Sequence, residues 1–304
     1  MPEIITVCHS AHGAGNSPMA LGVAEGSFAY AGLDVVMEEM PRTGDAVKRL
    51  IEGSCEFVVA GATPIINVAK AGHDPLIVMS IEAENVFAIM AAKHIRSPED
   101  LRGQTIAISG HREQDEMIMR RTLRDWGIDP DRDVELKLFG SRGKNWDAIV
   151  SGEAAAMTAT IPQPILARAI GFPVLKDYAE TPEPYQVGSV TTTRRYADAN
   201  PDIVRAFLGA QLRAVRLFQS DFAAALPHMK ARSKLDDVEV LRETNRLFGL
   251  AMEDYVPNPA ALAAVIRSLV EVFGEPIDID VNEVVDPSFA TALEGKAPYP
   301  PYRG

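Results

Sequence analysis

Two stretches decide the fold of this chain: Ala31-Gly32-Leu33-Asp34 followed by Gly53 and Gly72, and Trp126-Gly127-Ile128-Asp129 followed by Gly152 and Gly171. In both copies the last two glycines are 19 residues apart. Each copy begins where a helix-like run stops at a Gly-(Leu/Ile)-Asp step, and a left-handed helix end favours a residue without a Cβ there. A short apolar run, a helix, a buried strand and another helix follow in the same order. The repeat predicts two similar α/β lobes, and such lobes bind small ligands in the cleft between them.

Apolar runs and helical periodicity alternate up to Thr193, which indicates parallel, doubly wound sheets. The expected strands are Ile4–Val7, Val35–Met37, Phe57–Ala60, Leu76–Ser80, Val86–Met90, Thr105–Ile108, Val134–Leu138, Ala156–Ala159 and Gln186–Thr191. After Thr193 the pattern changes to four helices with almost no strand between them. They are expected at Pro201–Gln219, Asp221–Lys230, Asp236–Leu250 and Pro259–Phe273. We therefore expect two doubly wound α/β lobes and a C-terminal helical layer packed on the first lobe.

Two segments are expected to carry the chain between the lobes. Val86–Ala92 leaves the first lobe and Tyr185–Thr193 returns to it. Lobe one would then be discontinuous, formed by residues 1–90 and 195–304, and lobe two would be formed by residues 91–194. Two crossing strands make a natural hinge for closure of the cleft.

Composition narrows the class of partner. The chain has 304 residues and a net charge of −12, which argues against nucleic acid or an anionic membrane surface. No run approaches the length of apolar sequence that inserts into a membrane. Two cysteines, Cys8 and Cys55, give no disulfide framework, and we expect both to be buried and reduced. The sequence enters a strand at Ile4 without signal-peptide features, so we expect a cytoplasmic protein, or a periplasmic one if an export signal was removed.

Ligand contacts in such lobes come from loops just past the C-terminal ends of strands, where the next helix begins. Four loops qualify, and Gln186 on the returning strand joins them. The candidate ligand-binding residues are His9, Ser10, His12, Thr63, His111, Arg112, Thr160, Gln163 and Gln186. The sequence has no P-loop, no Gly-x-Gly-x-x-Gly after a strand and no zinc-binding motif, so we expect no cofactor and no metal.

Each candidate has a structural alternative. Arg112 can grip an oxyanion with its planar fork, or it can pair with Glu116 one helical turn later. Thr63 can offer a hydroxyl to an anion at a helix N-terminus, or it can simply cap that helix. A small organic anion is the expected ligand, because the cations and helix N-termini at these loops set the local charge.

Three motifs resemble those of type 2 periplasmic binding proteins. Residues 97–107, SPEDLRGQTIA, are similar to the segment that enters the second lobe in that family. Gly53–Phe57 and Gly61–Pro64 together resemble its G-x-x-D-f and G-x-x-P pair. Ala20–Val35 resembles a helix and strand of the nitrate, sulfonate and thiamine-precursor group. The similarity covers about residues 1–220.

This resemblance implies an alkanesulfonate-binding-like substrate-binding protein, with an ABC transporter permease as its partner if the protein is exported. It also leaves an alternative open, since the same scaffold carries cytoplasmic desulfinases, aromatic-acid decarboxylases and a pyrimidine-precursor synthase. An enzyme would draw its catalytic groups from Cys8, His9, His12 and His111, with the thiol as nucleophile and a histidine as base. The chain departs from the family pattern in its charged loop Gly110–Glu116 and in Ala155, where an acid is usual.

Overall fold

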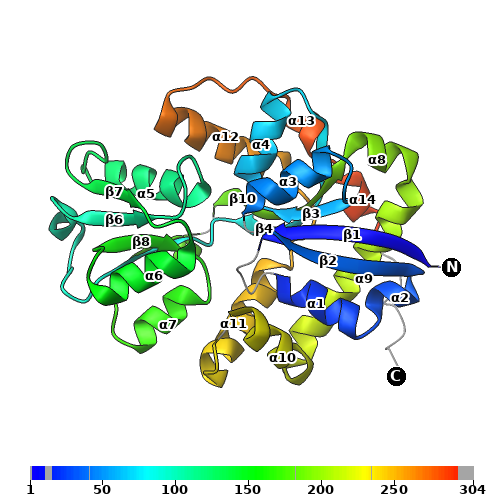
Figure 1. The fold of residues 1–304 in the computed structure, drawn as a ribbon, viewed down its shortest axis with the longest axis horizontal. Coiled ribbons are helices and arrows are strands. Elements are labelled where there is room, and N and C mark those ends of the chain that lie inside the picture. The colour runs from blue at the N-terminus through cyan, green and yellow to red at the C-terminus, as the bar shows by residue number, and fades with distance from the viewer. Residues whose placement is uncertain (1, 11–15, 41, 182, 234, 294–304) are drawn as a thin grey trace.

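The computed structural model describes residues 2–10, 16–40, 42–181, 183–233 and 235–293. Two five-stranded sheets lie in opposite halves of an elongated molecule (Figure 1). The first has the order β2-β1-β3-β10-β4, formed by Leu33–Met40, Glu3–Ser10, Phe57–Ala60, Pro184–Thr193 and Pro75–Glu84. The second has the order β7-β6-β8-β5-β9, formed by Glu135–Leu138, Thr105–Ile108, Ala156–Ala159, Ala88–Ala91 and Val174–Asp177.

The two sheets have the same construction. In the first, β1 pairs in parallel with β2 and β3, while β10 runs antiparallel between β3 and β4. In the second, β6 pairs in parallel with β7 and β8, while β5 runs antiparallel between β8 and β9. The antiparallel strand of each sheet thus comes from the part of the chain that crosses over from the other sheet. The predicted α/β fold of two doubly wound lobes is confirmed.

The duplicated glycines occupy matching places in the two halves. Gly32 and Gly127 precede β2 and β7, Gly53 and Gly152 lie just before β3 and β8, and Gly72 and Gly171 follow the helices after those strands. All six have left-handed backbones, with φ between 71° and 83°. Residues with a Cβ are strained in this region, so the glycine pattern marks three helix ends in each half of the molecule.

The chain crosses between the sheets at residues 85–87 and again at residues 178–183. The first crossing overlaps the start of the expected segment Val86–Ala92, and the second precedes the expected Tyr185–Thr193, because β5 and β10 are already members of the sheets that they enter. The crossings are tied together by Glu183, whose Oε1 accepts a hydrogen bond from Asn85 Nδ2 (3.0 Å). We propose these crossings as the lobe boundaries, so that lobe one resumes at β10 rather than at residue 195.

Helices cover both sheets. Those in the first part of the chain are α1 (Ser17–Ala24), α2 (Ser27–Tyr30), α3 (Thr43–Ile51), α4 (Ala62–Lys70), α5 (Gln114–Asp125), α6 (Arg142–Ser151) and α7 (Gln163–Ala169). Those in the last part are α8 (Arg194–Ala199), α9 (Pro201–Ser220), α10 (Phe222–Ser233), α11 (Val238–Ala251), α12 (Pro259–Phe273), α13 (Val281–Val284) and α14 (Ser288–Thr291). Short 3₁₀ turns add Pro98–Leu101 and Tyr178–Glu180.

The C-terminal helices do more than pack on the first lobe. α9 and α10 contact α1, and α12 contacts β10 of the first sheet but also α5 of the second lobe. Arg124 on α5 donates to the carbonyls of Glu271 and Val272 in the last turn of α12 (3.0 and 3.1 Å). A cation at a helix C-terminus satisfies carbonyls that lack an intrahelical partner. The helical layer therefore contacts both lobes.

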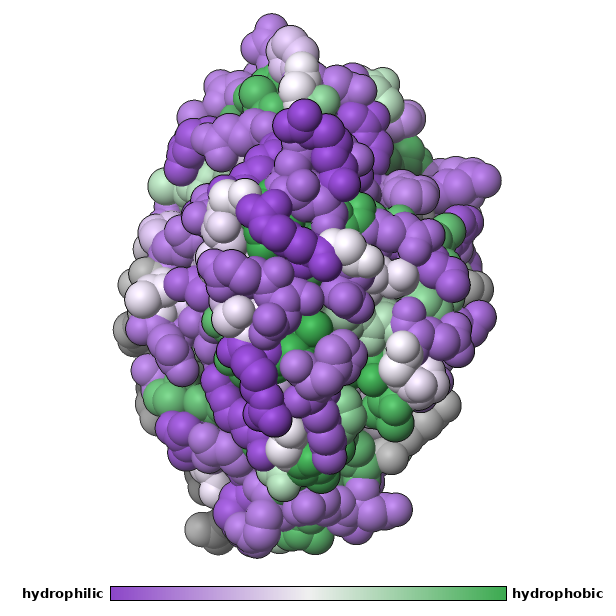
Figure 2. All heavy atoms as spheres, turned by 90° about the vertical axis from the view of Figure 1, so that its left-hand side faces the viewer, coloured by the Kyte–Doolittle hydropathy of each residue, from purple (hydrophilic) through white to green (hydrophobic). Residues whose placement is uncertain are grey.

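Two clusters of buried apolar side chains form the core, one between β1, β4 and the helices α1, α9 and α10, the other extending from α3 and α4 through β5 into the second lobe. Hydrophilic residues cover most of the second lobe's outer face, and apolar residues occupy only small areas between them (Figure 2). In the part of the chain that the structure describes, every helix is too short or too polar to cross a membrane.

Candidate functional site

A cavity of about 560 Å³ opens between the two lobes. Its walls are built at the C-terminal ends of the parallel strands of both sheets. Lobe one contributes Ser10 at the end of β1, Arg42 after β2 and Gly61 after β3, while lobe two contributes the loops after β6, β7 and β8. This is the edge at which open α/β sheets bind ligands.

Five helices begin at the cavity wall. The residues at their N-termini that line it are Asn16 for α1, Arg42 and Thr43 for α3, Gly61 and Pro64 for α4, Glu113 and Gln114 for α5, and Ser141 and Arg142 for α6. Each helix has at least eight residues. The first N–H groups of a helix lack intrahelical acceptors, and the helix dipole places partial positive charge at that end. Together, the free N–H groups and the dipoles of these five helices favour negative charge in the cavity.

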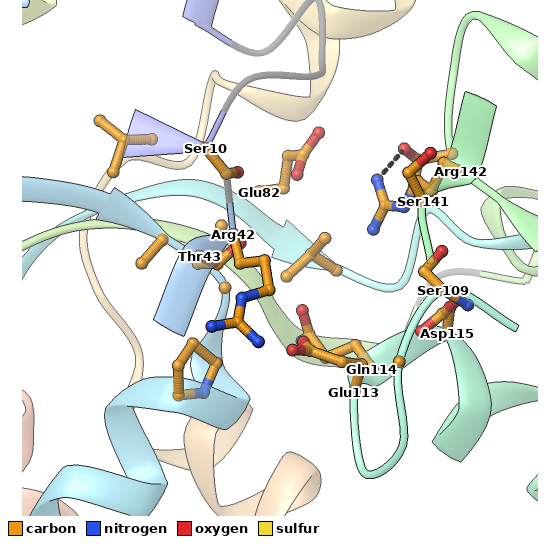
Figure 3. Close-up of a pocket in the computed structure, with 18 of the residues that line it drawn as sticks. Ser10, Arg42, Thr43, Glu82, Ser109, Glu113, Gln114, Asp115, Ser141 and Arg142 are labelled. Atoms are coloured by element: carbon orange, nitrogen blue, oxygen red, sulfur yellow. Dashed lines mark hydrogen bonds between the residues drawn. The ribbon is translucent and has the colours of Figure 1, made fainter. Parts of the chain in front are cut away.

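Arg142 is the cation best placed to use this environment. It is half-buried at the start of α6, and its Nη1 donates to Thr160 Oγ1 across the second lobe (3.1 Å). Its guanidinium carbon lies 5.7 Å from the ring centre of Phe87. Figure 3 shows the side chain at the cavity, with the hydrogen bond to Thr160 drawn. One hydrogen bond uses one of five N–H donors, so the others remain for a ligand.

A second arginine, Arg42, reaches toward the cavity from lobe one. Two of its guanidinium donors are already used, because Nε and Nη2 both donate to the Asp45 carboxylate (3.1 and 3.0 Å). The side chain is 76% exposed, so solvent screens its charge. In Figure 3 it extends toward Glu113 on the opposite wall. Arg42 is therefore a weaker anchor for an anion than Arg142.

Three carboxylates line the cavity with these arginines. Glu82 lies near the end of β4, and burial raises its pKa to about 7, while Arg142 across the cavity acts in the opposite direction. Glu113 precedes α5, and burial together with the nearby Asp115 raises its pKa, with Arg142 and Arg42 opposing the shift. Asp115 differs from both, since its Oδ2 accepts a hydrogen bond from the Ser109 backbone (2.7 Å).

Gln114 and Gln186 connect the lobes beneath the cavity. Gln114 Nε2 donates to the Gln186 carbonyl (3.1 Å), and the Gln186 side chain accepts from Ser80 and donates to the Gly188 carbonyl. The Gln114 Oε1 atom lies so close to Gly61 that a Cβ there would be 2.5 Å away. These contacts hold the two lobes together at the base of the cavity.

Three residues predicted from the sequence, Ser10, Thr160 and His111, line this cavity. Ser10 ends β1, and Thr160 follows β8 and accepts from Arg142. His111 is on the loop after β6, 65% exposed, with its Nδ1 3.8 Å from Glu116 Oε1.

Other predicted residues lie close to the cavity without lining it. Gln186 is buried in the floor, and Gln163 begins α7 behind the wall formed by Thr160. Thr63 is buried in the first turn of α4, and its hydroxyl has no hydrogen-bond partner among the described residues. His9 is 1% exposed, and burial lowers its pKa, while its Nδ1 lies 3.1 Å from the Ser10 carbonyl. His12 lies outside the described residues.

Arg112 turns away from the cavity, contrary to the expectation that it grips the ligand. Its backbone is left-handed, with φ 63°, and its N–H donates to Glu116 Oε2 (2.6 Å). Its guanidinium instead pairs with Glu275 beyond α12 (2.8 Å) and lies 5.1 Å from the Phe273 ring centre. The backbone turn that starts α5 thus directs this arginine to the C-terminal helical layer.

The catalytic role considered for Cys8 lacks the geometry that a nucleophile needs. Cys8 is fully buried inside β1, does not line the cavity, and burial raises the pKa of its thiol. Cys55 is also buried, and burial and the Cys8 thiol raise its pKa further. A reactive thiol needs a lowered pKa and access to substrate. Within the described ranges, no three His, Cys, Asp or Glu side chains are arranged to hold a metal ion.

Neither Glu82 nor Arg142 is among the site residues predicted from the sequence, although both line the cavity. Glu82 has no loop signal because it lies inside the apolar strand β4. The feature that marks it is the change from a mainly apolar run to two acids, Glu82 and Glu84, in the last part of that strand. Arg142 follows Gly140-Ser141, and Ser141 caps α6 by accepting from Lys144 N. That cap marks a helix N-terminus at the cleft, and Arg142 is the first residue of this helix.

Two lobes of matching topology, with a cavity at the carboxyl ends of both sets of parallel strands, define the type 2 periplasmic-binding-protein fold. The family model described as NMT1/THI5 like matches residues 16–223, about two thirds of the chain. The chain belongs to this family, which confirms the resemblance noted from its motifs. A comparison with curated protein sequences finds no match.

Solved structures share the fold at low sequence identity. The alkanesulfonate-binding protein SsuA from Xanthomonas axonopodis pv. citri, bound to MOPS, has a TM-score of 0.73 and 20% identity, covering 94% of this chain and 98% of that one. The periplasmic nitrate-binding protein NrtA from Synechocystis PCC 6803 has a TM-score of 0.79 and 12% identity, covering 96% and 88%. The DszB C27S mutant in complex with biphenyl-2-sulfinic acid has a TM-score of 0.66 and 13% identity, covering 96% and 99%.

Proposed function

We propose that this protein binds a small organic anion in the cavity between its lobes, as a substrate-binding protein of the ABC-transporter type. The observation that carries the proposal is the convergence of five helix N-termini and Arg142 on one cavity, with α1, α3 and α4 in lobe one and α5 and α6 in lobe two. N–H groups at helix ends and a guanidinium together bind oxyanions without a metal. The alkanesulfonate-binding and nitrate-binding proteins that share this fold support a ligand of this charge.

The cavity size fits the same class of ligand. A volume of about 560 Å³ is within the range of roughly 300–1,000 Å³ that is usual for small-molecule sites.

Closure of the lobes completes the site in this proposal. The two crossings at residues 85–87 and 178–183 form the hinge, and ligand contacts from both walls favour the closed state. A transporter permease is the corresponding protein partner, which would recognise the closed form. The enzyme alternative gains no support of this kind, because the Cys8 thiol is buried and does not line the cavity.

Titration calorimetry tests the proposal with propane-1-sulfonate, butyrate and nitrate, each against propan-1-ol as the uncharged control. We expect saturable binding of at least one anion and none of the alcohol. Small-angle scattering at saturation should show a smaller radius of gyration, because the lobes close. Absence of binding by all three anions would refute the proposal, and so would equal binding of the alcohol.

A further inference from the structure

Two carboxylates in the cavity have no protein partner. Among the hydrogen bonds and ion pairs of the described residues, none involves the carboxylate of Glu82 or of Glu113, although most other carboxylates in half-buried positions are paired. Both residues line the cavity, one from each lobe. A half-buried carboxylate without donors is costly to keep charged, so its environment is incomplete in the ligand-free protein.

The backbone makes room for both carboxylates. Gly188 on β10 lies opposite Glu82, and a Cβ at Gly188 would be 3.2 Å from Glu82 Oε2. Gly110 accommodates Glu113 in the same way, since a Cβ there would be 2.7 Å from Glu113 Cγ. Each acid therefore rests over a glycine at the cavity wall, and larger residues would displace it.

Each lobe contributes one glutamate and one arginine to the cavity. Glu82 and Arg42 come from lobe one, while Arg142 and Glu113 come from lobe two. In Figure 3 the side chains of these four residues extend into the space between the lobes from opposite sides. Electrostatic interactions link Glu82 with Arg142 and Glu113 with Arg42, but neither pair is in contact. The cavity thus offers separate places for negative and positive ligand groups.

We propose that the ligand is amphoteric: an organic anion that also carries a protonated amine or another cationic N–H group, bound by Glu82 with support from Glu113. This inference rests on the proposed anion site and specifies its ligand class. Arg142 and the helix N-termini hold the anionic end, and the two carboxylates accept hydrogen bonds from the cationic end. A purely anionic ligand would instead meet two like charges, and its affinity would suffer.

The pH dependence of binding distinguishes these ligands. In the free protein burial keeps Glu82 partly protonated near neutral pH, with its pKa raised to about 7. A cationic group binds the ionised form, so binding releases a proton and affinity rises with pH; a plain anion favours the protonated form, so its affinity falls. The other charged groups around this cavity are Arg142 on α6, Glu113 and Asp115 at α5, Arg42 before α3 and His111 on the loop after β6.

Calorimetry on matched pairs tests the inference: 3-aminopropane-1-sulfonate against propane-1-sulfonate, and 4-aminobutyrate against butyrate. All four keep fixed charges between about pH 6 and about pH 8.5. In the wild-type protein the amino member of a pair should bind about ten- to a hundredfold more tightly. Its affinity should rise over this pH range, while that of the plain anion falls.

Two variants test whether Glu82 causes the preference for the amino ligand and its pH dependence. Glu82→Gln keeps the shape of the side chain and should remove both the preference for the amine and its pH dependence. Glu84→Gln, two residues later on the same strand with an exposed side chain, is the control and should retain both. Melting temperatures measured alongside show that each variant is folded.

The outcomes separate the two proposals. If the plain anions bind as tightly as their amino partners, or if Glu82→Gln retains the amine preference, the inference is overturned and the anion site stands. The two carboxylates would then pair with the arginines when the lobes are closed. If no member of either pair binds, the anion site and the inference both fail.

Discussion

Replacement of Arg142 by alanine should weaken binding of the anion about ten- to a hundredfold. The free protein commits only one guanidinium hydrogen bond, to Thr160 Oγ1 at 3.1 Å, so the remaining donors face the cavity. One hydrogen bond to a charged group contributes about 1.5–3 kcal/mol, and about 1.4 kcal/mol corresponds to a factor of ten in affinity. Arg142→Lys should recover only part of the loss, because an ammonium lacks the planar fork that grips two oxygens.

Arg112→Ala is the matched control, since it removes the same charge from the neighbouring loop of the same lobe. Its guanidinium pairs with Glu275, so this variant should keep the wild-type affinity. Both side chains of that ion pair are about half exposed, so we expect only a small loss of stability. Calorimetry with the anion that binds most tightly, beside thermal melts, measures both quantities. Equal affinity of Arg142→Ala and wild type, or a large loss in Arg112→Ala, would refute the assignment.

Three further predictions concern stability and reactivity. Gly22→Ala should destabilise the protein by about 1–3 kcal/mol, because its Cβ would lie 2.4 Å from that of Ala214 in the packed α1–α9 contact; an unchanged urea midpoint would contradict this. Burial raises the pKa of Glu82 to about 7, so protonation of Glu82 stabilises the ligand-free protein fully below about pH 4.5 and this stabilisation is lost as the pH rises through 7. The free energy of unfolding of wild type relative to Glu82→Gln should therefore decrease between about pH 5 and about pH 8, and a constant difference would argue against it. Cys8 and Cys55 should react with Ellman's reagent only after unfolding, because both are buried with raised pKa values; rapid labelling of the native protein would disprove this.

Much of the fold could be predicted because its determinants are local. Glycines at helix ends need a left-handed backbone, so their spacing revealed both lobes before any contact was known. The predicted strands and the four long C-terminal helices correspond to elements of the structure. β9 was missed, since Val174–Asp177 is half-buried at a sheet edge and ends in two charged residues, which leaves no apolar run to detect.

The site was harder to predict because side-chain direction depends on distant packing. Arg112 and Arg142 both follow a strand of the second lobe and both lie near a helix start, so sequence position alone does not separate them. The left-handed backbone at Arg112 and the acceptor at Glu275, which lies far along the chain, decide that Arg112 leaves the cavity. Glu82 likewise becomes a site residue only when β10 places Gly188 beside it.

A crystal structure with the tightest-binding of the tested anions measures the central claim most directly. We predict the oxyanion in the interlobe cavity, with its oxygens at about 3 Å from the Arg142 guanidinium and the lobes closed around it. The amines of amphoteric ligands should lie at the same distance from the Glu82 carboxylate. Anion density outside the cavity, or inside it without contact to Arg142, would contradict this account.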